Sequence, residues 1–305
     1  MYIHINIRYR SIFCAILCMF FLVIISCKSS PEPREVIDLS NINIDGGEEN
    51  SYLNVNTANQ PIFYNLYLSG DLTLLFDTIG IPFEDNLLNS TDQISDYVTT
   101  NKKAMNLGVY TADLSYTKVF NQYEVSEKYF RAMEKLAVEL GIPGDYFENA
   151  AKRFDRNIAN RDSLIKIANE VFMTTDQYLK ANEREAASSL IIYGGWIEAM
   201  YIATAISNSY SNHLLFERIS EQKSSLNNLM QLLENDNKEN ELTPYLKHLD
   251  VLKKEFKKFN FDYKTDYTSG SVQAIKVLDE YRSWVIEMHQ VLKKIRQEVV
   301  ASAAV

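Results

Sequence analysis

Glycine and proline are scarce in this chain, with ten Gly and six Pro among its 305 residues. All-β sandwiches and barrels need a turn about every 8–12 residues, and those turns use both residue types heavily. Residues 146–192 contain neither of them. The scarcity argues against a β-rich fold and predicts long helices.

Histidine and cysteine are also few, which limits the chemistry that the chain can support. His213, His248 and His289 are far apart in the sequence and form no His-x-x-x-His pair. There is no Gly-x-Ser-x-Gly motif and no glycine-rich phosphate loop. Cys14 and Cys18 lie in a segment that is expected to be removed, so we expect no disulfide. We therefore expect no metal, no cofactor and no catalytic residue, and the sequence leans away from an enzyme.

Basic residues are outnumbered, with 31 Lys and Arg against 40 Asp and Glu and a net charge of −9. Affinity for nucleic acid comes mainly from cationic contacts to phosphate. A nucleic-acid partner is therefore not expected. The same deficit gives no attraction to an anionic membrane surface, so attachment to a membrane would need a lipid.

The first 27 residues carry the most specific signal in the sequence. Arg8 and Arg10 precede an apolar run at 12–25, which ends in Ser26-Cys27. A basic start, an apolar centre of about 7–15 residues and a small residue before the cleavage point are typical of a secretory signal peptide. The alternative is an uncleaved anchor, but a membrane-spanning helix needs about 20 apolar residues. We expect residues 1–26 to be a signal peptide.

The junction at Cys27 resembles the lipobox of bacterial lipoproteins, in which an aliphatic residue stands two places before a small residue that precedes cysteine. The resemblance implies that Cys27 becomes the first residue of the mature protein and carries the membrane-anchoring lipid. Residues 27–60 contain Pro31, Pro33 and Gly46-Gly47 and little apolar surface. We expect this stretch to be a flexible tether, followed by a helical domain at 61–305.

Apolar periodicity and helix end signals predict an all-α fold, a single multi-helix bundle of about ten helices. Ser90, Asp145, Asn182 and Thr243 are expected to cap helix N-termini. The expected helices are 62–79, 90–98, 101–122, 125–140, 145–158, 160–181, 183–209, 212–234, 243–259 and 272–302.

The helix expected at 183–209 stands apart because residues 190–206 are apolar or small on every side except at Glu198 and Thr204. A helix without a polar face is buried all round. We expect it at the centre of the bundle rather than across a membrane, since Gly194-Gly195 and Glu198 interrupt the run.

Two segments are candidates for ligand binding. In the first, Tyr193, Trp196 and Glu198 surround the glycine pair Gly194-Gly195, whose cost in a helix suggests close approach of another backbone or of a ligand. The alternative interpretation is structural, with Glu198 paired to a buried Arg, Lys or Tyr and the glycines easing a helix crossing.

In the second segment, Tyr110, Asp113 and Tyr116 are spaced i, i+3, i+6 and follow one stripe of a helix. A carboxylate between phenols suits a polar ligand. The alternative is a buried hydrogen-bond network that fixes helix register. Gly108 and Ala112 make a smooth patch on the same helix for contact with another helix.

If these two helices pack through their small residues, Asp113 and Glu198 would face one cavity and shift each other's pKa. This is the one pairing here that suggests acid–base chemistry or cation binding. An ion pair with Arg131, Arg153 or Arg161 would explain either acid equally well.

The segments 106–116, 153–163 and 194–201 resemble a group of uncharacterised helical lipoproteins from Bacteroidota, over about residue 61 to the C-terminus. The group has no assigned activity, so the resemblance implies an envelope location but no functional residue. Lys28, directly after Cys27, resembles outer-membrane sorting signals. Because acidic residues linked to surface display are limited to Glu32 and Glu35, we expect the periplasmic face and leave surface exposure open.

Together these observations predict a lipid-anchored envelope protein that binds a partner protein or a small molecule without catalysis. A pocket lined by the candidate residues would favour a ligand, whereas a solidly packed centre with one large apolar surface patch would favour a protein–protein or scaffold role. A hydrolase acting through Asp113 and Glu198 is the remaining alternative.

Overall fold

The computed structural model describes residues 75–76, 79–157 and 160–301. The chain divides into two compact units, 1–55 and 56–305, and every described residue belongs to the second. The expected signal peptide 1–26, Cys27, the tether 27–60 and nearly all of the expected helix 62–79 lie outside the described residues.

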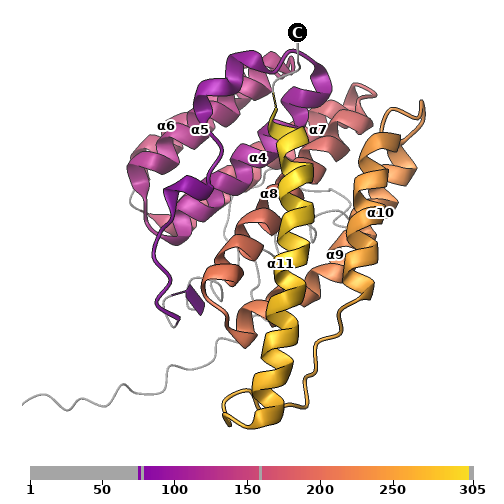
Figure 1. Cartoon of the computed structure of the whole chain (residues 1–305). Coiled ribbons are helices and arrows are strands. Elements are labelled where there is room, and N and C mark those ends of the chain that lie inside the picture. The colour runs from indigo at the N-terminus through magenta and orange to yellow at the C-terminus, as the bar shows by residue number, and fades with distance from the viewer. Residues whose placement is uncertain (1–74, 77–78, 158–159, 302–305) are drawn as a thin grey trace, which may run out of the picture. The chain divides into compact units, whose positions relative to one another are not determined.

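The prediction of an all-α fold is confirmed, because the described residues form helices and no β-strand (Figure 1). The α-helices match the expected spans to within a few residues. Two 3-10 helices, η3 (Asp85–Leu87) and η4 (Thr91–Asp96), precede them. The α-helices are α4 (Thr100–Val119), α5 (Tyr123–Glu139), α6 (Asp145–Arg156), α7 (Arg161–Ala181), α8 (Glu185–Ser209), α9 (His213–Asp236), α10 (Thr243–Lys257) and α11 (Val272–Val300).

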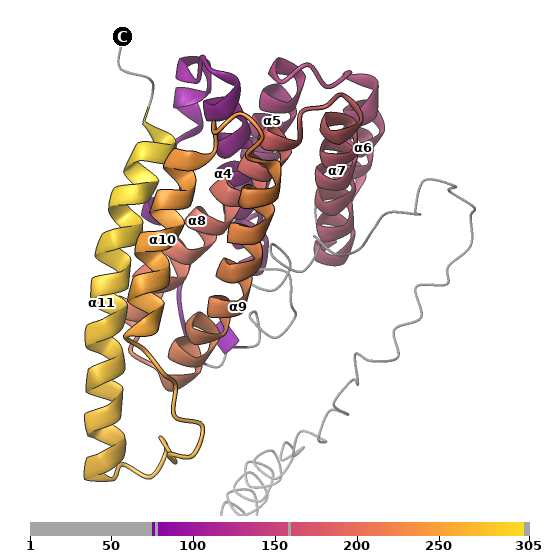
Figure 2. The same cartoon turned by 90° about the vertical axis from the view of Figure 1, so that its right-hand side faces the viewer.

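Helix α8 is the core helix of the bundle, as predicted. It contacts α4 and α7 on one side and α9 and α11 on the other, and Figure 2 shows α4 and α8 between the α5–α7 group and the α9–α11 group. By length and composition α8 is the one helix among the described residues that would suit a membrane span, but 83% of its apolar stretch is buried within the protein. Its uniform apolarity is thus explained by packing on all sides.

Helices α4 and α8 cross in direct backbone contact at their glycines. A Cβ placed on Gly108 would lie 1.9 Å from the carbonyl oxygen of Ile191 and 2.7 Å from the backbone nitrogen of Gly195. A Cβ placed on Gly194 would lie 2.0 Å from the carbonyl oxygen of Met105. The interpretation that the glycines ease a helix crossing is therefore confirmed.

Three of the expected N-caps are wrong, whereas the Ser90 hydroxyl does accept the backbone N–H of Asp92. Helix α6 begins at Asp145 itself, because its N-cap Gly144 already has helical dihedral angles (φ −58°, ψ −29°). Asn182 ends α7 as its C-cap instead of opening α8. Thr243 lies inside α10, whose N-cap is Leu242.

Candidate functional site

Asp113 of α4 and Glu198 of α8 meet beside the glycine crossing, and both side chains are completely buried. Their carboxyl groups lie close enough to influence each other's ionisation. Arg296 of α11 forms a two-pronged ion pair with Glu198, with Nε 2.6 Å from Oε2 and Nη2 2.7 Å from Oε1. The guanidinium also lies over the ring of Tyr201, 4.3 Å from its centroid. We call Asp113, Glu198 and Arg296 the acid cluster.

The acid cluster places two carboxyl groups in a site without water access. Burial, and next the charge of Glu198, raise the pKa of Asp113 well above its usual value, against the opposing effect of Arg296. These effects favour the protonated form of the Asp113 carboxyl. Asp113 Oδ1 has no hydrogen-bond partner among the described residues. Glu198 and Arg296 then cancel in charge, which is the usual requirement for burying ions.

A surface segment at 84–97, which we call the strap, covers this cluster and contains η3 and η4. Its Asn89 backbone N–H donates to Asp113 Oδ2 at 3.2 Å. Arg296 Nη2 donates to the carbonyl oxygen of Leu87 at 3.3 Å. Asn89 is itself buried, and its side-chain amide donates to the hydroxyl of Tyr97 at 3.2 Å. In Figure 1 the strap is the indigo to purple chain that leads into α4.

Three tyrosines fasten the strap from the helices below it. The hydroxyl of Tyr110 donates to the carbonyl oxygen of Ser90 at 2.8 Å, and that of Tyr129 donates to the carbonyl oxygen of Asn89 at 2.9 Å. The hydroxyl of Tyr116 accepts the backbone N–H of Glu84 at 3.1 Å. Burial is the main cause that raises the pKa of Tyr110 and Tyr129, and it raises the pKa of Tyr116 to about 12. These phenols remain neutral hydrogen-bonding groups at physiological pH.

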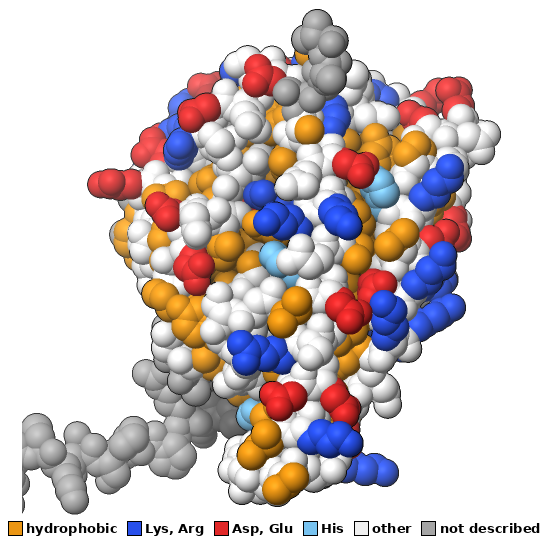
Figure 3. Space-filling model, viewed as in Figure 1, with side chains coloured by type: hydrophobic (Ala, Val, Ile, Leu, Met, Phe, Trp, Pro, Cys, Tyr) orange, Lys and Arg blue, Asp and Glu red, His pale blue; other side chains and the backbone are white. Residues whose placement is uncertain are grey.

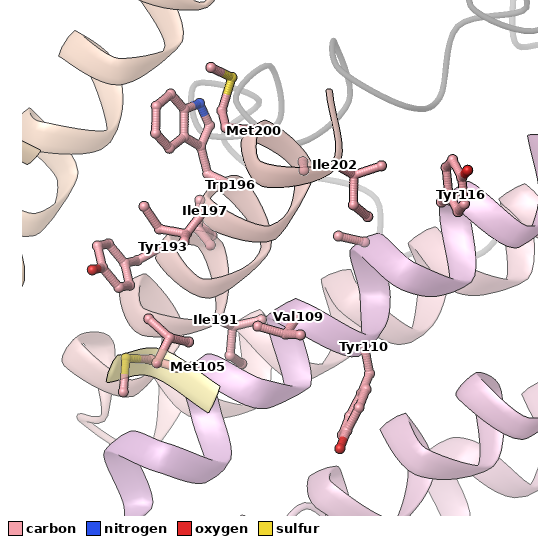
Figure 4. Packing of buried hydrophobic residues seen from close by; sticks show 14 of the residues in the cluster. Met105, Val109, Tyr110, Tyr116, Ile191, Tyr193, Trp196, Ile197, Met200 and Ile202 are labelled. Carbon is pink, nitrogen blue, oxygen red and sulfur yellow. The ribbon is translucent and has the colours of Figure 1, made fainter. Parts of the chain in front are cut away.

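Tyr193 and Trp196 lie elsewhere, on the side of α8 that faces away from Tyr110 and Tyr116 (Figure 4). The hydroxyl of Tyr193 is 2.7 Å from Nδ1 of His248, whose Nε2 is 3.2 Å from a carboxylate oxygen of Glu298. The structure therefore divides the six predicted binding residues into two groups. Tyr110, Asp113, Tyr116 and Glu198 surround the base of the strap, and Tyr193 and Trp196 do not join them.

Two cavities of the described surface do not touch these residues. A polar one of about 460 Å³ is lined by the starts of α4 and α8 and by the polar turn after α9, including Glu185, Asp236 and Lys238. Another of about 530 Å³ lies beside Trp284 of α11. Neither is lined by any of the six predicted binding residues, whose side chains are at most 1% exposed.

Arg296 is not one of the arginines that the sequence offered as alternative partners for the two acids. Arg131 instead pairs with Asp155 at 2.6 Å on the surface. Arg296 lies next to the apolar stripe of α11, four residues after Leu292 and three before Val299, both of which are buried. A charged residue at the edge of a buried stripe is the signal that would have found it.

Comparisons with family models, with curated proteins and with solved structures found no match for this chain. The relation to helical lipoproteins of Bacteroidota stays a prediction. Among the described residues no group of three or more His, Cys, Asp or Glu is placed to hold a metal ion. The assignment of function therefore depends on the geometry of the acid cluster and the strap.

The raised pKa of Asp113 makes the stability of the fold depend on pH. The folded chain keeps a proton that the unfolded chain releases above the usual pKa of 3.8, so stability falls as pH rises from that value toward the raised pKa. Asp113→Asn supplies a neutral donor of the same shape and should remove this fall. We expect the advantage of the variant over the wild type to grow by about 1.4 kcal/mol per pH unit within that window.

Urea unfolding at a series of pH values above 3.8 measures this difference. Asp250→Asn, which removes an exposed carboxyl from α10, is the matched control and should follow the wild-type profile. Parallel profiles for Asp113→Asn and the wild type would show that Asp113 is ionised in the folded protein.

Proposed function

We propose that this protein is a lipid-anchored protein of the cell envelope, on the periplasmic face of an outer membrane, and that it acts as a non-catalytic interaction module. The leader at 1–26 and the lipobox-like junction at Cys27 support the anchoring. The closed acid cluster supports the interaction role. On the face shown in Figure 3, acidic and basic side chains are interspersed, a surface suited to contacts with proteins rather than with polyanions.

The observation that carries the proposal is the burial of the acid cluster. A hydrolase must bring its catalytic carboxyls within hydrogen-bond reach of a substrate. Here Asp113 and Glu198 are fully buried, and their oxygens face each other, Arg296 and the backbone of Asn89. These groups hold helices and strap together, and such a solidly packed centre is one of the two features expected of a protein–protein or scaffold role.

Lipid attachment is tested by mass spectrometry of the protein extracted from membranes of cells that express the full chain. We expect the mature N-terminus to be an acylated Cys27. Cys27→Ser should keep the leader and carry no acyl group, because the residue that receives the lipid is gone. Cys18→Ser, which changes a cysteine inside the leader, is the control and should be processed normally. A wild-type protein with an intact, unacylated leader would contradict the anchoring proposal.

The interaction role is tested by photo-crosslinking in the same cells. Val98 directly follows the strap and is 73% exposed, so a photoreactive residue there should give a discrete crosslinked product. The same residue at Val138 of α5, which is 48% exposed, serves as a control away from the strap. Turnover of an envelope substrate that Asp113→Asn abolishes without loss of folding would instead support the hydrolase alternative.

A further inference from the structure

The strap is held by main-chain hydrogen bonds to the helices and by four buried side chains. Three side-chain donors, from Tyr110, Tyr129 and Arg296, bond to its carbonyl oxygens. Two side-chain acceptors, from Asp113 and Tyr116, take its backbone N–H groups. Donors and acceptors that satisfy consecutive main-chain groups are the means by which proteins bind extended peptides of varied sequence.

The strap has little structure of its own to hold it in place. Its two helices are short 3-10 helices. The backbone bonds at their ends measure 3.1 Å from the Leu88 N–H to the Asp85 oxygen, and 3.4 Å from the Leu87 N–H to the Glu84 oxygen and from the Tyr97 N–H to the Ile94 oxygen. Most of its side chains are not buried; the buried ones are Leu87, Asn89, Ile94 and Tyr97. Segments with few internal bonds open at lower free energy than the helices beneath them.

The surface beneath the strap does not depend on the strap for its form. The ion pair of Glu198 with Arg296 joins α8 and α11 directly, and α4 packs against α8. The glycine crossing of α4 and α8 involves helix backbone alone. If the strap leaves, this surface keeps its donors and acceptors in place and presents them to another chain.

We propose that the strap occupies a peptide-binding groove formed by α4, α5 and α11, and that the groove binds an extended segment of a partner polypeptide in its place. The inference deepens the proposed interaction function, because it names the class of partner. Leu87 is buried beneath the strap, so the preferred segment carries an aliphatic residue at that place. The side chain of Asn89 is bonded to Tyr97 of the strap itself. Recognition of the remaining positions is through the peptide backbone.

The strap competes with a free peptide for the groove and so lowers the apparent affinity of the peptide. A segment tethered in the same chain acts at an effective concentration in the millimolar range, so a free peptide binds weakly until the strap is loosened. Leu87→Ala with Asn89→Ala removes two of the four buried side chains of the strap and changes no helix residue beneath it. A matched control, Asp92→Ala with Gln93→Ala, changes two exposed strap residues.

The test uses a fluorescent peptide with the sequence of residues 81–98 and the full chain in detergent, with binding followed by anisotropy. We expect the Leu87/Asn89 double variant to bind this peptide at least about tenfold more tightly than the Asp92/Gln93 control. The peptide carrying the same two alanines in place of the leucine and asparagine should lose that binding. Equal binding to both proteins, or no binding to the folded double variant, would overturn the proposal.

Hydrogen exchange on the wild type gives a second test that needs no variant. The Asn89 amide, which donates to Asp113, should exchange through a local opening while amides in the middle of α4 and α8 stay protected. If the Asn89 amide exchanges only together with those helix amides, the strap does not open by itself and the proposal fails. In that case a crosslinked product at Val98 would still support the interaction function, through a surface other than the groove.

Discussion

Glu198→Gln is expected to destabilise the fold by about 3–5 kcal/mol, because it leaves a buried arginine without its carboxylate. The side chain of Arg296 is only 14% exposed, and Glu198 supplies an acceptor oxygen to each of two guanidinium nitrogens. Glutamine offers one oxygen and turns an amide donor toward a guanidinium that is also a donor. Urea unfolding followed by helical circular dichroism measures the loss.

A double-mutant cycle with Asp113→Asn sharpens this prediction. In Glu198→Gln the remaining acid, Asp113, can give up its proton and partly neutralise Arg296. In the Glu198→Gln/Asp113→Asn double variant no carboxyl remains near the guanidinium, so the loss should exceed the sum of the two single losses. Glu287→Gln is the matched control on α11: its 3.4 Å pair with Lys258 is exposed, and we expect a change below about 1 kcal/mol. A Glu198→Gln loss as small as this control would contradict the buried ion pair.

Gly108→Ala should cost at least about 3 kcal/mol, at the upper end of overpacking effects. Alanine normally stabilises a helix interior by about 1 kcal/mol relative to glycine. A loss of stability in Gly108→Ala would therefore indicate a steric clash at the helix crossing. The added Cβ would meet the carbonyl oxygen of Ile191 at 1.9 Å, and backbone atoms cannot rotate away as a side chain can. Gly194→Ala, whose Cβ would meet the Met105 oxygen at 2.0 Å, should behave alike.

Gly144→Ala is the control for the two helix glycines. Gly144 has an ordinary negative φ, and an added Cβ would meet no atom within 4 Å. Its substitution should change the free energy of unfolding by less than about 1 kcal/mol. Thermal and urea unfolding of the three alanine variants compares them directly, and a stabilised Gly108→Ala would show that α4 and α8 are not in backbone contact.

Much of the fold follows from the sequence because it is encoded locally. The absence of glycine and proline over residues 146–192 allows long helices, and the lack of a polar face on α8 predicts its burial. The meeting of α4 with α8 is also encoded, by Gly108 on one helix and Gly194 on the other. Misplaced caps such as Asn182 shift helix ends by one or two residues, since the same side chain suits a C-cap and an N-cap.

The candidate site is less accessible to sequence reasoning. Spacing places Tyr110 and Asp113 on one stripe, but it does not say that Tyr193 faces His248 on the far side of α8. Arg296 is 98 residues from Glu198 in the chain, and no local pattern joins them. The position of the strap could not be predicted from its sequence, because its hydrogen bonds to the helices are made by backbone groups that every residue possesses.

The most direct test of this account is the protonation of Asp113, measured by carbon-13 NMR of the side-chain carboxyl groups as a function of pH. Asp113→Asn assigns the signal by its disappearance. We predict that the Asp113 carboxyl titrates well above its usual value, because burial and the charge of Glu198 raise its pKa. A transition near the usual value of 3.8 would show two independent carboxylates and would contradict the acid cluster described here.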